Sequence, residues 1–148
     1  MITERSAGAV VYNEKNKKFL LLFRKANEKY KDLWDFPRGL VEEDEKDTVI
    51  REIEEETGIN DIDFIAKFRE FISFFYKRDN ELIKKEIIYF LVKTEQEKIK
   101  LSYEHNDYKW ADVKVALELL THKSSKEVLK KADKFLKEIL KQRTLGDY

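Results

Sequence analysis

Two apolar runs near the start of the chain predict a pair of β-strands. They cover residues 5–12 and 18–24, and the polar segment 13–17 between them is typical of a turn. The second run contains Phe19 to Phe23 without alternation of apolar and polar positions, which indicates a strand covered on both of its faces. The start of the chain is therefore predicted to form a strand–turn–strand unit.

Two later segments, residues 62–76 and 84–93, are rich in β-branched and aromatic residues and predict further strands. The polar residues 77–81 between them predict the turn. A mostly polar passage follows, in which a short strand is predicted around 108–110.

Helical spacing appears in three places. Residues 44–57 are predicted to form a helix, with Asp44 as its N-cap and Gly58 just beyond its end. Its apolar positions recur on one side at about 100° per residue, at Val49, Ile50, Ile53 and Thr57. Helices are also predicted near 113–120 and 125–142, and the second of these has a one-sided apolar stripe that is expected to pack onto the sheet. The stripe consists of Val128, Leu129, Ala132, Phe135, Leu136, Ile139 and Leu140.

Composition limits the kind of protein this chain is. Its 148 residues fit one domain, spanning 1–148, and 42% hydrophobic content argues against disorder despite 41% charged residues. Lysine plus arginine and aspartate plus glutamate each total 30, so no global field favours nucleic acid or membrane. There is no cysteine, which excludes disulfides and thiolate metal sites. Because no long apolar run is present, we expect a cytoplasmic protein without a membrane segment.

The helix predicted at 44–57 carries an unusual concentration of carboxylates. On a helical wheel, Glu52, Glu55 and Glu56 share an arc of roughly 100° that borders the apolar side, whereas Glu54 points the opposite way. Like charges this close destabilise a helix unless protons or a cation offset them. One interpretation is a solvated acidic face. The other is a site for a hard divalent cation such as Mg²⁺, which prefers carboxylate oxygens.

The stretch from Gly39 to Ile59 resembles the Nudix box, whose pattern is Gly-x5-Glu-x7-Arg-Glu-U-x-Glu-Glu-x-Gly-U with U apolar. The second half is matched in full, by Arg51, Glu52, Ile53, Glu55, Glu56, Gly58 and Ile59. Counting back from Arg51 places the first glutamate at Glu43, and the loop from Gly39 to Glu43 is then two residues short. Using Glu45 instead would shorten the helix by two residues and turn it by about 200°. We prefer the short loop, because loops accept deletions and helix faces do not.

This resemblance implies an α+β fold, an α/β/α sandwich with a mixed, mainly antiparallel central sheet. It implies that Glu52, Glu55 and Glu56 hold Mg²⁺, or Mn²⁺, with the Gly39 carbonyl as a further ligand and Arg51 and Glu43 in support. It also implies attack of water on a phosphorus of a nucleoside diphosphate linked to another group, with metal and glutamate activating the water.

The segment before Gly39 resembles that of asymmetric dinucleoside tetraphosphate hydrolases. Residues 34–39 read Trp-Asp-Phe-Pro-Arg-Gly, similar to the W-x-x-P-K-G of those enzymes and also to RNA 5′-pyrophosphohydrolases. Arg38 replaces the usual lysine and is a candidate phosphate ligand, since arginine can grip a phosphate through two donors. Trp34 and Phe36 are interpreted either as part of this motif or as core residues beside the box helix.

A second resemblance to the same hydrolases lies in residues 84–120, where Leu-Ser-Tyr-Glu-His matches their L-S-x-E-H passage. It makes Glu104 a candidate metal ligand or base, although a capping or solvated role is the alternative. His105 is a candidate phosphate contact or a surface histidine. The remaining candidates for substrate binding are two aromatic residues that stack on a nucleobase or merely fill strands, and two cations for phosphate, namely Tyr76, Tyr89, Lys85 and Arg5.

The sequence thus favours asymmetric cleavage of diadenosine tetraphosphate to ATP and AMP. Triphosphorylated RNA ends, nucleoside triphosphates and nucleoside diphosphate sugars are alternative substrates, and a non-catalytic nucleotide-binding module is a third possibility. The neutral net charge argues against long nucleic acid as a partner. The general base remains open among Glu52, Glu55 and Glu104, and the protein is expected to be a monomer or homodimer that binds a small nucleotide.

Overall fold

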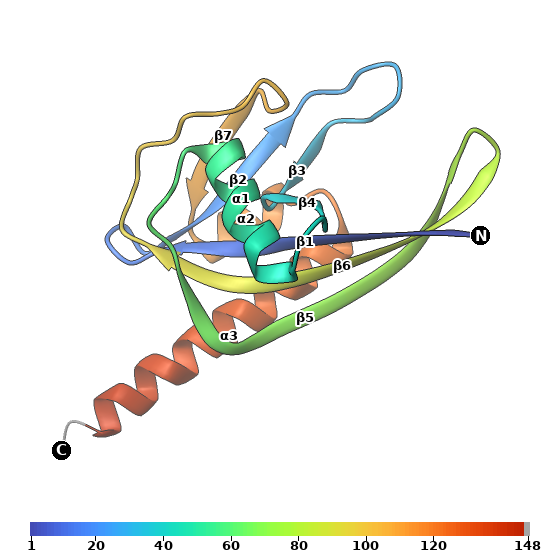
Figure 1. The fold of residues 1–148 in the computed structure, drawn as a ribbon. Coiled ribbons are helices and arrows are strands. Elements are labelled where there is room, and N and C mark those ends of the chain that lie inside the picture. Colours follow the sequence, from blue (N-terminus) through green and yellow to red (C-terminus); the bar gives the residue numbers. More distant parts are fainter. Residues whose placement is uncertain (147–148) are drawn as a thin grey trace.

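The computed structural model describes residues 1–146, with side chains up to residue 143, and contains a mixed β-sheet between helices (Figure 1). The elements in chain order are β1 (Ile2–Asn13), β2 (Lys18–Arg24), β3 (Leu33–Asp35), β4 (Arg38–Leu40), α1 (Glu45–Thr57), β5 (Asp63–Arg78), β6 (Glu81–Thr94), β7 (Asp107–Ala111), α2 (Val113–Leu119) and α3 (Lys123–Gly146). No helix among the described residues is long and apolar enough to cross a bilayer.

The sheet has the strand order β3-β2-β1-β6-β5, with β4 paired to β1 and β7 paired to β2. β1 and β6 run parallel from Ile2 opposite Ile83 to Asn13 opposite Thr94, and the other pairs are antiparallel. β1 contacts β2 only at its end and pairs with β4 in its middle. The sheet therefore opens between β1 and β2, and the segment leading to α1 occupies that opening. The predicted fold class is confirmed.

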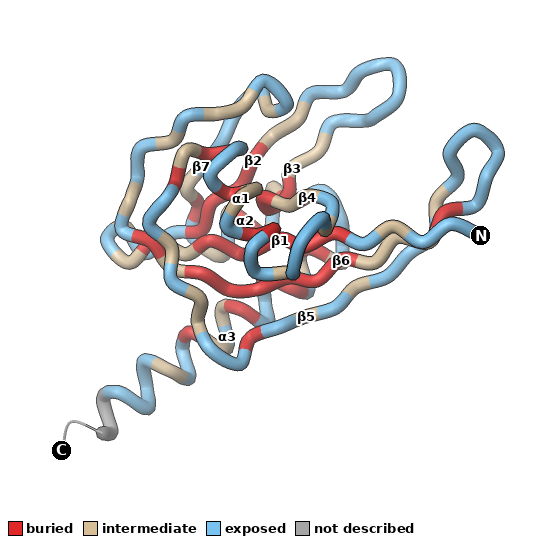
Figure 2. The backbone as a smooth tube through the Cα atoms, viewed as in Figure 1, coloured by how far each residue is buried: buried red, intermediate tan, exposed pale blue. Residues whose placement is uncertain are grey.

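Both faces of the sheet are covered, and the central strands are the most buried part of the chain (Figure 2). α1 packs on one face through Val49 and Ile53, against Ala7, Leu20 and Ile88. On the other face, α2 and α3 cover a second apolar cluster, whose largest buried members include Leu21, Tyr89, Leu91, Leu120 and Leu129. β2 contributes alternately to both clusters, which explains its uninterrupted apolar run and confirms that it is covered on both sides.

The elements predicted from the apolar pattern are all present, and the short pairing segments were missed. β3 and β4 consist of three residues each inside a stretch interpreted as loop, because pairing this brief leaves no periodicity to detect. In α1, Val49, Ile53 and Thr57 are buried as expected, but Ile50 is exposed and its assignment to the buried side was wrong. In α3, the predicted stripe is buried at Val128, Leu129, Ala132 and Leu136.

The hairpin formed by β5 and β6 extends beyond the helices, and its tip lies near the start of β1 (Figure 1). A bulge at Lys67, with φ of 73°, separates the inner part of β5 from this extension. Phe71 and Phe75 are about half exposed there. The hairpin carries Tyr76 and Lys85, so it is the element that places these two predicted substrate residues.

Candidate functional site

α1 is a capped helix whose ends follow from its sequence. The Asp44 carboxylate accepts a hydrogen bond from the Asp47 backbone N–H, which satisfies one of the unpaired donors of the first turn. At the other end, Gly58 adopts φ of 76° and its N–H donates to the Glu54 carbonyl. The caps set where α1 begins and ends, and the burial of Val49 and Ile53 against the sheet sets its rotation and with it the direction of each glutamate.

β4 brings Gly39 against this helix. Gly39 pairs with Ala7 of β1 and lies directly beside the Glu52 side chain. A Cβ on Gly39 would overlap the carboxyl carbon of Glu52, so only glycine fits here without moving that carboxylate. The close approach explains why a glycine stands at this position of the motif, and it places backbone polar groups next to a box glutamate.

We expect Gly39→Ala to lower kcat by about 10²-fold, because the added methyl group displaces the Glu52 carboxylate. The free energy of unfolding should also fall, by about 1 to 3 kcal/mol, through overpacking. Steady-state kinetics and urea unfolding measure the two effects. Leu40→Ala, at the exposed neighbouring position of β4, is the control and should change kcat little. Full activity in Gly39→Ala would show that the position of Glu52 is not critical.

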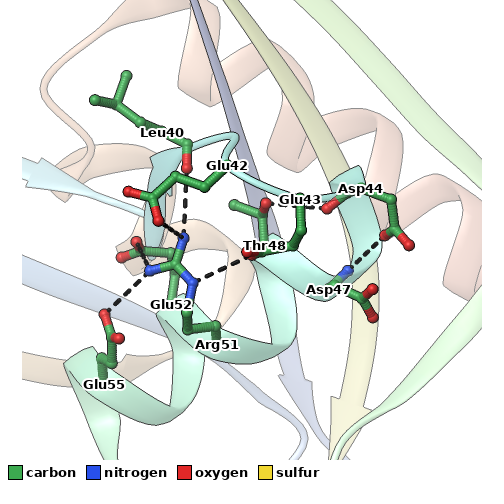
Figure 3. Close-up of polar contacts among 9 residues, drawn as sticks. All are labelled: Leu40, Glu42, Glu43, Asp44, Asp47, Thr48, Arg51, Glu52 and Glu55. Atoms are coloured by element: carbon green, nitrogen blue, oxygen red, sulfur yellow. Dashed lines mark hydrogen bonds and ion pairs between the residues drawn. The ribbon is translucent and has the colours of Figure 1, made fainter.

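Arg51 is the centre of a network of carboxylates (Figure 3). Its Nε donates to Glu43 at 3.2 Å, and its Nη1 donates to Glu52 at 2.9 Å and to Glu55 at 3.4 Å. Burial acts to lower the pKa of the Arg51 guanidinium, but Glu43 and Glu52 outweigh this and raise it. Glu45 instead bonds Arg69 of β5 at 2.9 Å. The short loop therefore places Glu43, and not Glu45, beside Arg51.

The three box glutamates differ in burial. Glu56 is 5% exposed, and one of its carboxylate oxygens has no hydrogen-bond partner. Burial, reinforced by Glu52 and Glu104, raises the pKa of Glu56 to about 9, while the Arg38 backbone N–H acts against this. Burial also raises the pKa of Glu52, with Arg51 opposing. The Glu55 side chain is 58% exposed, so it lies at the solvent side of the arc that borders the apolar side of α1.

A small cavity of about 100 Å³ lies beside Glu56. Its polar lining residues come from five separate segments and are Arg24, Asp35, Arg38, Glu56, Glu104 and His105. Three buried polar atoms that lack a protein partner belong to this lining, namely Arg24 Nε, Glu56 Oε2 and His105 Nδ1. Buried polar atoms are normally hydrogen-bonded, so a cavity with several unpaired ones is suited to a polar occupant.

The loop after β6 brings Glu104 and His105 to this cavity. It crosses the end of α1, where the Lys100 N–H donates to the Thr57 carbonyl at 2.8 Å and the Ser102 N–H to the Glu56 carbonyl at 3.3 Å. It then returns to β2 through the Asn106 N–H, which donates to the Phe23 carbonyl. Two motifs that lie far apart in sequence, the box and the Glu-His passage, therefore meet at one place.

The residues fit a hard divalent cation chemically, although not in their present arrangement. Among residues 1–146, no three acidic or histidine side chains are close enough together to hold a metal ion. Arg51 engages two of the box glutamates, donating hydrogen bonds to Glu52 and Glu55. The unpaired oxygen and raised pKa of Glu56 are what a carboxylate cluster shows when only protons offset its charge. Carboxylate oxygens of this kind are the donors that Mg²⁺ or Mn²⁺ prefers.

The predicted substrate residues are placed differently from one another. Arg38 and His105 line the cavity, and burial lowers the pKa of His105. Lys85 is half-buried, and burial lowers its pKa, with the nearby Arg38 charge acting in the same direction. Tyr76 lies on the extended hairpin, outside the cavity, and its hydroxyl donates a hydrogen bond to Glu4 of β1. Arg5 is also outside it and pairs with Glu45 at 3.6 Å.

Tyr89 is a core residue. Nucleobase stacking and strand packing were its two interpretations, and the second holds, because its side chain is fully buried and its ring packs edge-on against Phe36. Its hydroxyl contacts Arg38 at 3.0 Å. The alternation along β6 turns this tyrosine into the core, so its role is internal. Phe36 is buried as well, and Trp34 packs against Phe23, so core packing was the right alternative for these two aromatic residues.

Sequence reasoning missed Arg24 and Asp35. Arg24 ends β2, lines the cavity and lies over the Tyr30 ring at 4.4 Å, where the ring face attracts its charge. Asp35 lies within the 34–39 motif but was not predicted to be a site residue. The available signals were a charged residue at the end of an apolar strand and a carboxylate inside an aromatic motif, and neither is distinctive without the cavity.

Comparison with known proteins agrees with the motifs. The family model of the NUDIX domain matches residues 3–132. An RNA pyrophosphohydrolase from Nitratiruptor sp. is 33% identical and covers 74% of this chain and 77% of that protein. An asymmetrical bis(5′-nucleosyl)-tetraphosphatase from Mus musculus is 34% identical, and the match covers 70% of this chain and 71% of that protein. A dihydroneopterin triphosphate diphosphatase from Haemophilus influenzae is 30% identical, and the match covers 86% of this chain and 85% of that protein.

A solved structure is similar over nearly the whole chain. The binary complex of a C. elegans Ap4A hydrolase superposes with a TM-score of 0.76 at 28% identity, covering 91% of this chain and 98% of that one.

Proposed function

The chain belongs to the NUDIX family of pyrophosphohydrolases, and on that premise we propose that it cleaves diadenosine tetraphosphate asymmetrically, to ATP and AMP. One observation carries the proposal: the two segments that resemble tetraphosphate hydrolases meet at one cavity. Arg38 of the 34–39 segment and Glu104 of the 101–110 passage both line this cavity beside Glu56. Similarity to an asymmetrical tetraphosphatase and to an Ap4A hydrolase supports the same substrate.

The metal would be held by Glu52, Glu55 and Glu56, with the Gly39 carbonyl as a further ligand. When bound, Mg²⁺ neutralises phosphate charge and lowers the pKa of the attacking water. A carboxylate of this cluster, or Glu104 across the cavity, accepts the proton of that water as it attacks phosphorus. Arg51 orients Glu52 and Glu55, since it already contacts both.

The cationic side of the cavity is suited to the polyphosphate chain. Arg38 and Arg24 line it, and Arg38 is paired with Asp35 through Nη1. Each guanidinium is held on one side, Arg38 by Asp35 and Arg24 by the Tyr30 ring, so both present their donors in a defined direction. Arginine binds phosphate oxygens through paired donors, which favours a substrate with several consecutive phosphates.

Triphosphorylated RNA is a second candidate substrate, because an RNA pyrophosphohydrolase is as similar in sequence as the tetraphosphatase. Arg5 and Arg69 lie along an open groove beside the start of α1, but Glu43, Asp44, Glu45 and Asp47 line the same groove. A backbone-tracking surface for RNA needs a net positive charge, and this groove is mixed.

Incubation with Mg²⁺ and a panel of dinucleoside polyphosphates, nucleoside triphosphates, a nucleoside diphosphate sugar and a triphosphorylated oligoribonucleotide tests the substrate. We expect ATP and AMP in equal amounts from diadenosine tetraphosphate, with the highest kcat/KM of the panel. Water labelled with heavy oxygen identifies the attacked phosphorus through the labelled product. Faster turnover of another nucleotide would make that nucleotide the substrate in place of diadenosine tetraphosphate. Binding without any turnover would indicate a nucleotide-binding module.

A further inference from the structure

Asp35 is a buried carboxylate whose two oxygens both have partners. It is 5% exposed, and its Oδ1 accepts hydrogen bonds from the Phe36 N–H at 2.8 Å and the Ser125 hydroxyl at 2.9 Å. Its Oδ2 accepts from Arg38 Nη1 at 2.5 Å. A buried charge is tolerated only when it is paired and hydrogen-bonded, and Asp35 meets both conditions.

Arg38 uses a single nitrogen for its contacts inside the protein. Nη1 donates both to Asp35 and to the Tyr89 hydroxyl, at 2.5 Å and 3.0 Å. Within the described part of the chain, Nε and Nη2 have no side-chain partner, while the residue lines the cavity beside Glu56. Burial acts to lower the pKa of Arg38, and Tyr89 and Asp35 together raise it, so the guanidinium keeps its charge.

The partners of Arg38 are themselves held by separate elements. Ser125 is buried near the start of α3, and Tyr89 is buried in β6 with its ring against Phe36. Gly8 leaves room for this arrangement, since a Cβ there would lie 2.7 Å from the Arg38 Cβ and 3.1 Å from the Tyr89 ring. The position of one guanidinium nitrogen is therefore determined from α3 and from β6.

We infer that Asp35 is a positioning residue, which together with Tyr89 fixes Nη1 of Arg38 so that the remaining guanidinium donors face a phosphoryl oxygen beside Glu56. The inference rests on the proposed function, because it assumes a phosphate-bearing substrate in the cavity. It also explains why arginine stands where related hydrolases have lysine: a single ammonium group offers no second, rigidly placed nitrogen for the substrate once Asp35 holds the first.

The alternative role for Asp35 is structural, as a link between the 34–38 segment and α3. Thr121 provides a matched control for that role, because its hydroxyl accepts from the Trp34 N–H at 2.8 Å and its own N–H donates to the Trp34 carbonyl. Thr121 thus ties the same segment to the α2–α3 connection without contacting Arg38. A residue that acts only by anchoring the segment should behave like Thr121.

The test is a pair of double-mutant cycles with Arg38→Lys. Asp35→Asn keeps the shape and both Oδ1 contacts but turns an amide toward Nη1, and we expect it to raise KM by about 10- to 100-fold with a smaller change in kcat. The double variant with Arg38→Lys should be no worse than Arg38→Lys alone, because both changes remove the same alignment. Thr121→Val combined with Arg38→Lys should instead show additive effects, with Thr121→Val alone changing kcat/KM less than about threefold.

Two further measurements make each outcome decisive. The cycles are read on whichever nucleotide the wild-type protein turns over and, in parallel, from calorimetric binding of inorganic tripolyphosphate in the presence of Ca²⁺. Failure to cleave diadenosine tetraphosphate would therefore reject the proposed substrate without affecting the cycles. Additivity of Asp35→Asn and Arg38→Lys would overturn the inference. If Asp35→Asn does not fold, Tyr89→Phe, which removes the other Nη1 contact, takes its place in the same cycle, and additivity there would overturn it equally.

Discussion

Glu56→Gln is expected to lower kcat by about 10³-fold or more while the protein stays folded. Glu56 is the most buried carboxylate of α1, and it lies at the cavity that Arg38 and Glu104 line. Glutamine has nearly the same shape, but it is neutral and has one carbonyl oxygen in place of two carboxylate oxygens. It is therefore a poor ligand for a hard cation, and the phosphate charge would remain unneutralised.

Glu54→Gln is the matched control for this variant. Glu54 stands two residues away on the same helix, is exposed and makes no contact with Arg51 or with the cavity. The same chemical change there should leave kcat within about twofold, because surface substitutions away from a site have small effects. Steady-state kinetics over a Mg²⁺ titration separates the two variants. Equal activity of Glu56→Gln and wild type at saturating Mg²⁺ would show that Glu56 is not a metal ligand.

Much of the fold could be predicted because its signals are local. The caps of α1 depend on residues adjacent in sequence, Asp44 with Asp47 and Gly58 with its own backbone, and both were predicted. Most of the longer strands follow from apolar runs or from segments rich in β-branched and aromatic residues. β3 and β4 could not be found this way, since their pairing partners in β1 and β2 are distant in sequence and each contributes only three residues.

The site could be predicted in part for the same reason. The box glutamates lie on one helix, so their spacing gives their mutual directions, and Arg51 was expected among them. Side-chain exposure does not follow from the wheel: Glu55 is 58% exposed, whereas Glu52, which lies against Gly39, is 15% exposed. The role of Tyr89 stayed open between base stacking and core packing, because an aromatic residue in a strand looks the same in sequence whether it lines a cleft or the core.

The long-range contacts around the cavity could not be predicted from the sequence. Asp35 accepts a hydrogen bond from Ser125 across ninety positions of sequence, and His105 reaches the cavity that Arg24 lines only because the loop after β6 returns to β2. Contacts of this kind depend on the packing of four elements, and no spacing in the chain encodes them. These contacts also lie outside the Nudix box, since neither Arg38 nor its partners Asp35 and Tyr89 belong to that pattern.

The stability of the metal-free protein should fall as pH rises, and Glu56 should be the main cause. The pKa of Glu56 is about 9 in the folded protein, against an ordinary value of 4.5 in the unfolded chain. Between these two values the folded state binds more protons than the unfolded state, so the free energy of unfolding decreases with increasing pH. One pKa unit corresponds to about 1.4 kcal/mol, so the full shift amounts to several kcal/mol.

Urea unfolding of wild type and Glu56→Gln in the presence of EDTA, at pH values from about 5 to about 9, measures this contribution. Glutamine does not titrate, so the variant should lose less stability across this range and should be more stable than wild type near its upper end. Added Mg²⁺ should stabilise the wild type increasingly as pH rises, because the ion binds the carboxylate and competes with its proton. In Glu56→Gln that increase should disappear. Parallel pH dependence in the two proteins would mean that Glu56 is already ionised in the folded state, and a cation would then no longer be needed to explain how a carboxylate is tolerated at this buried position.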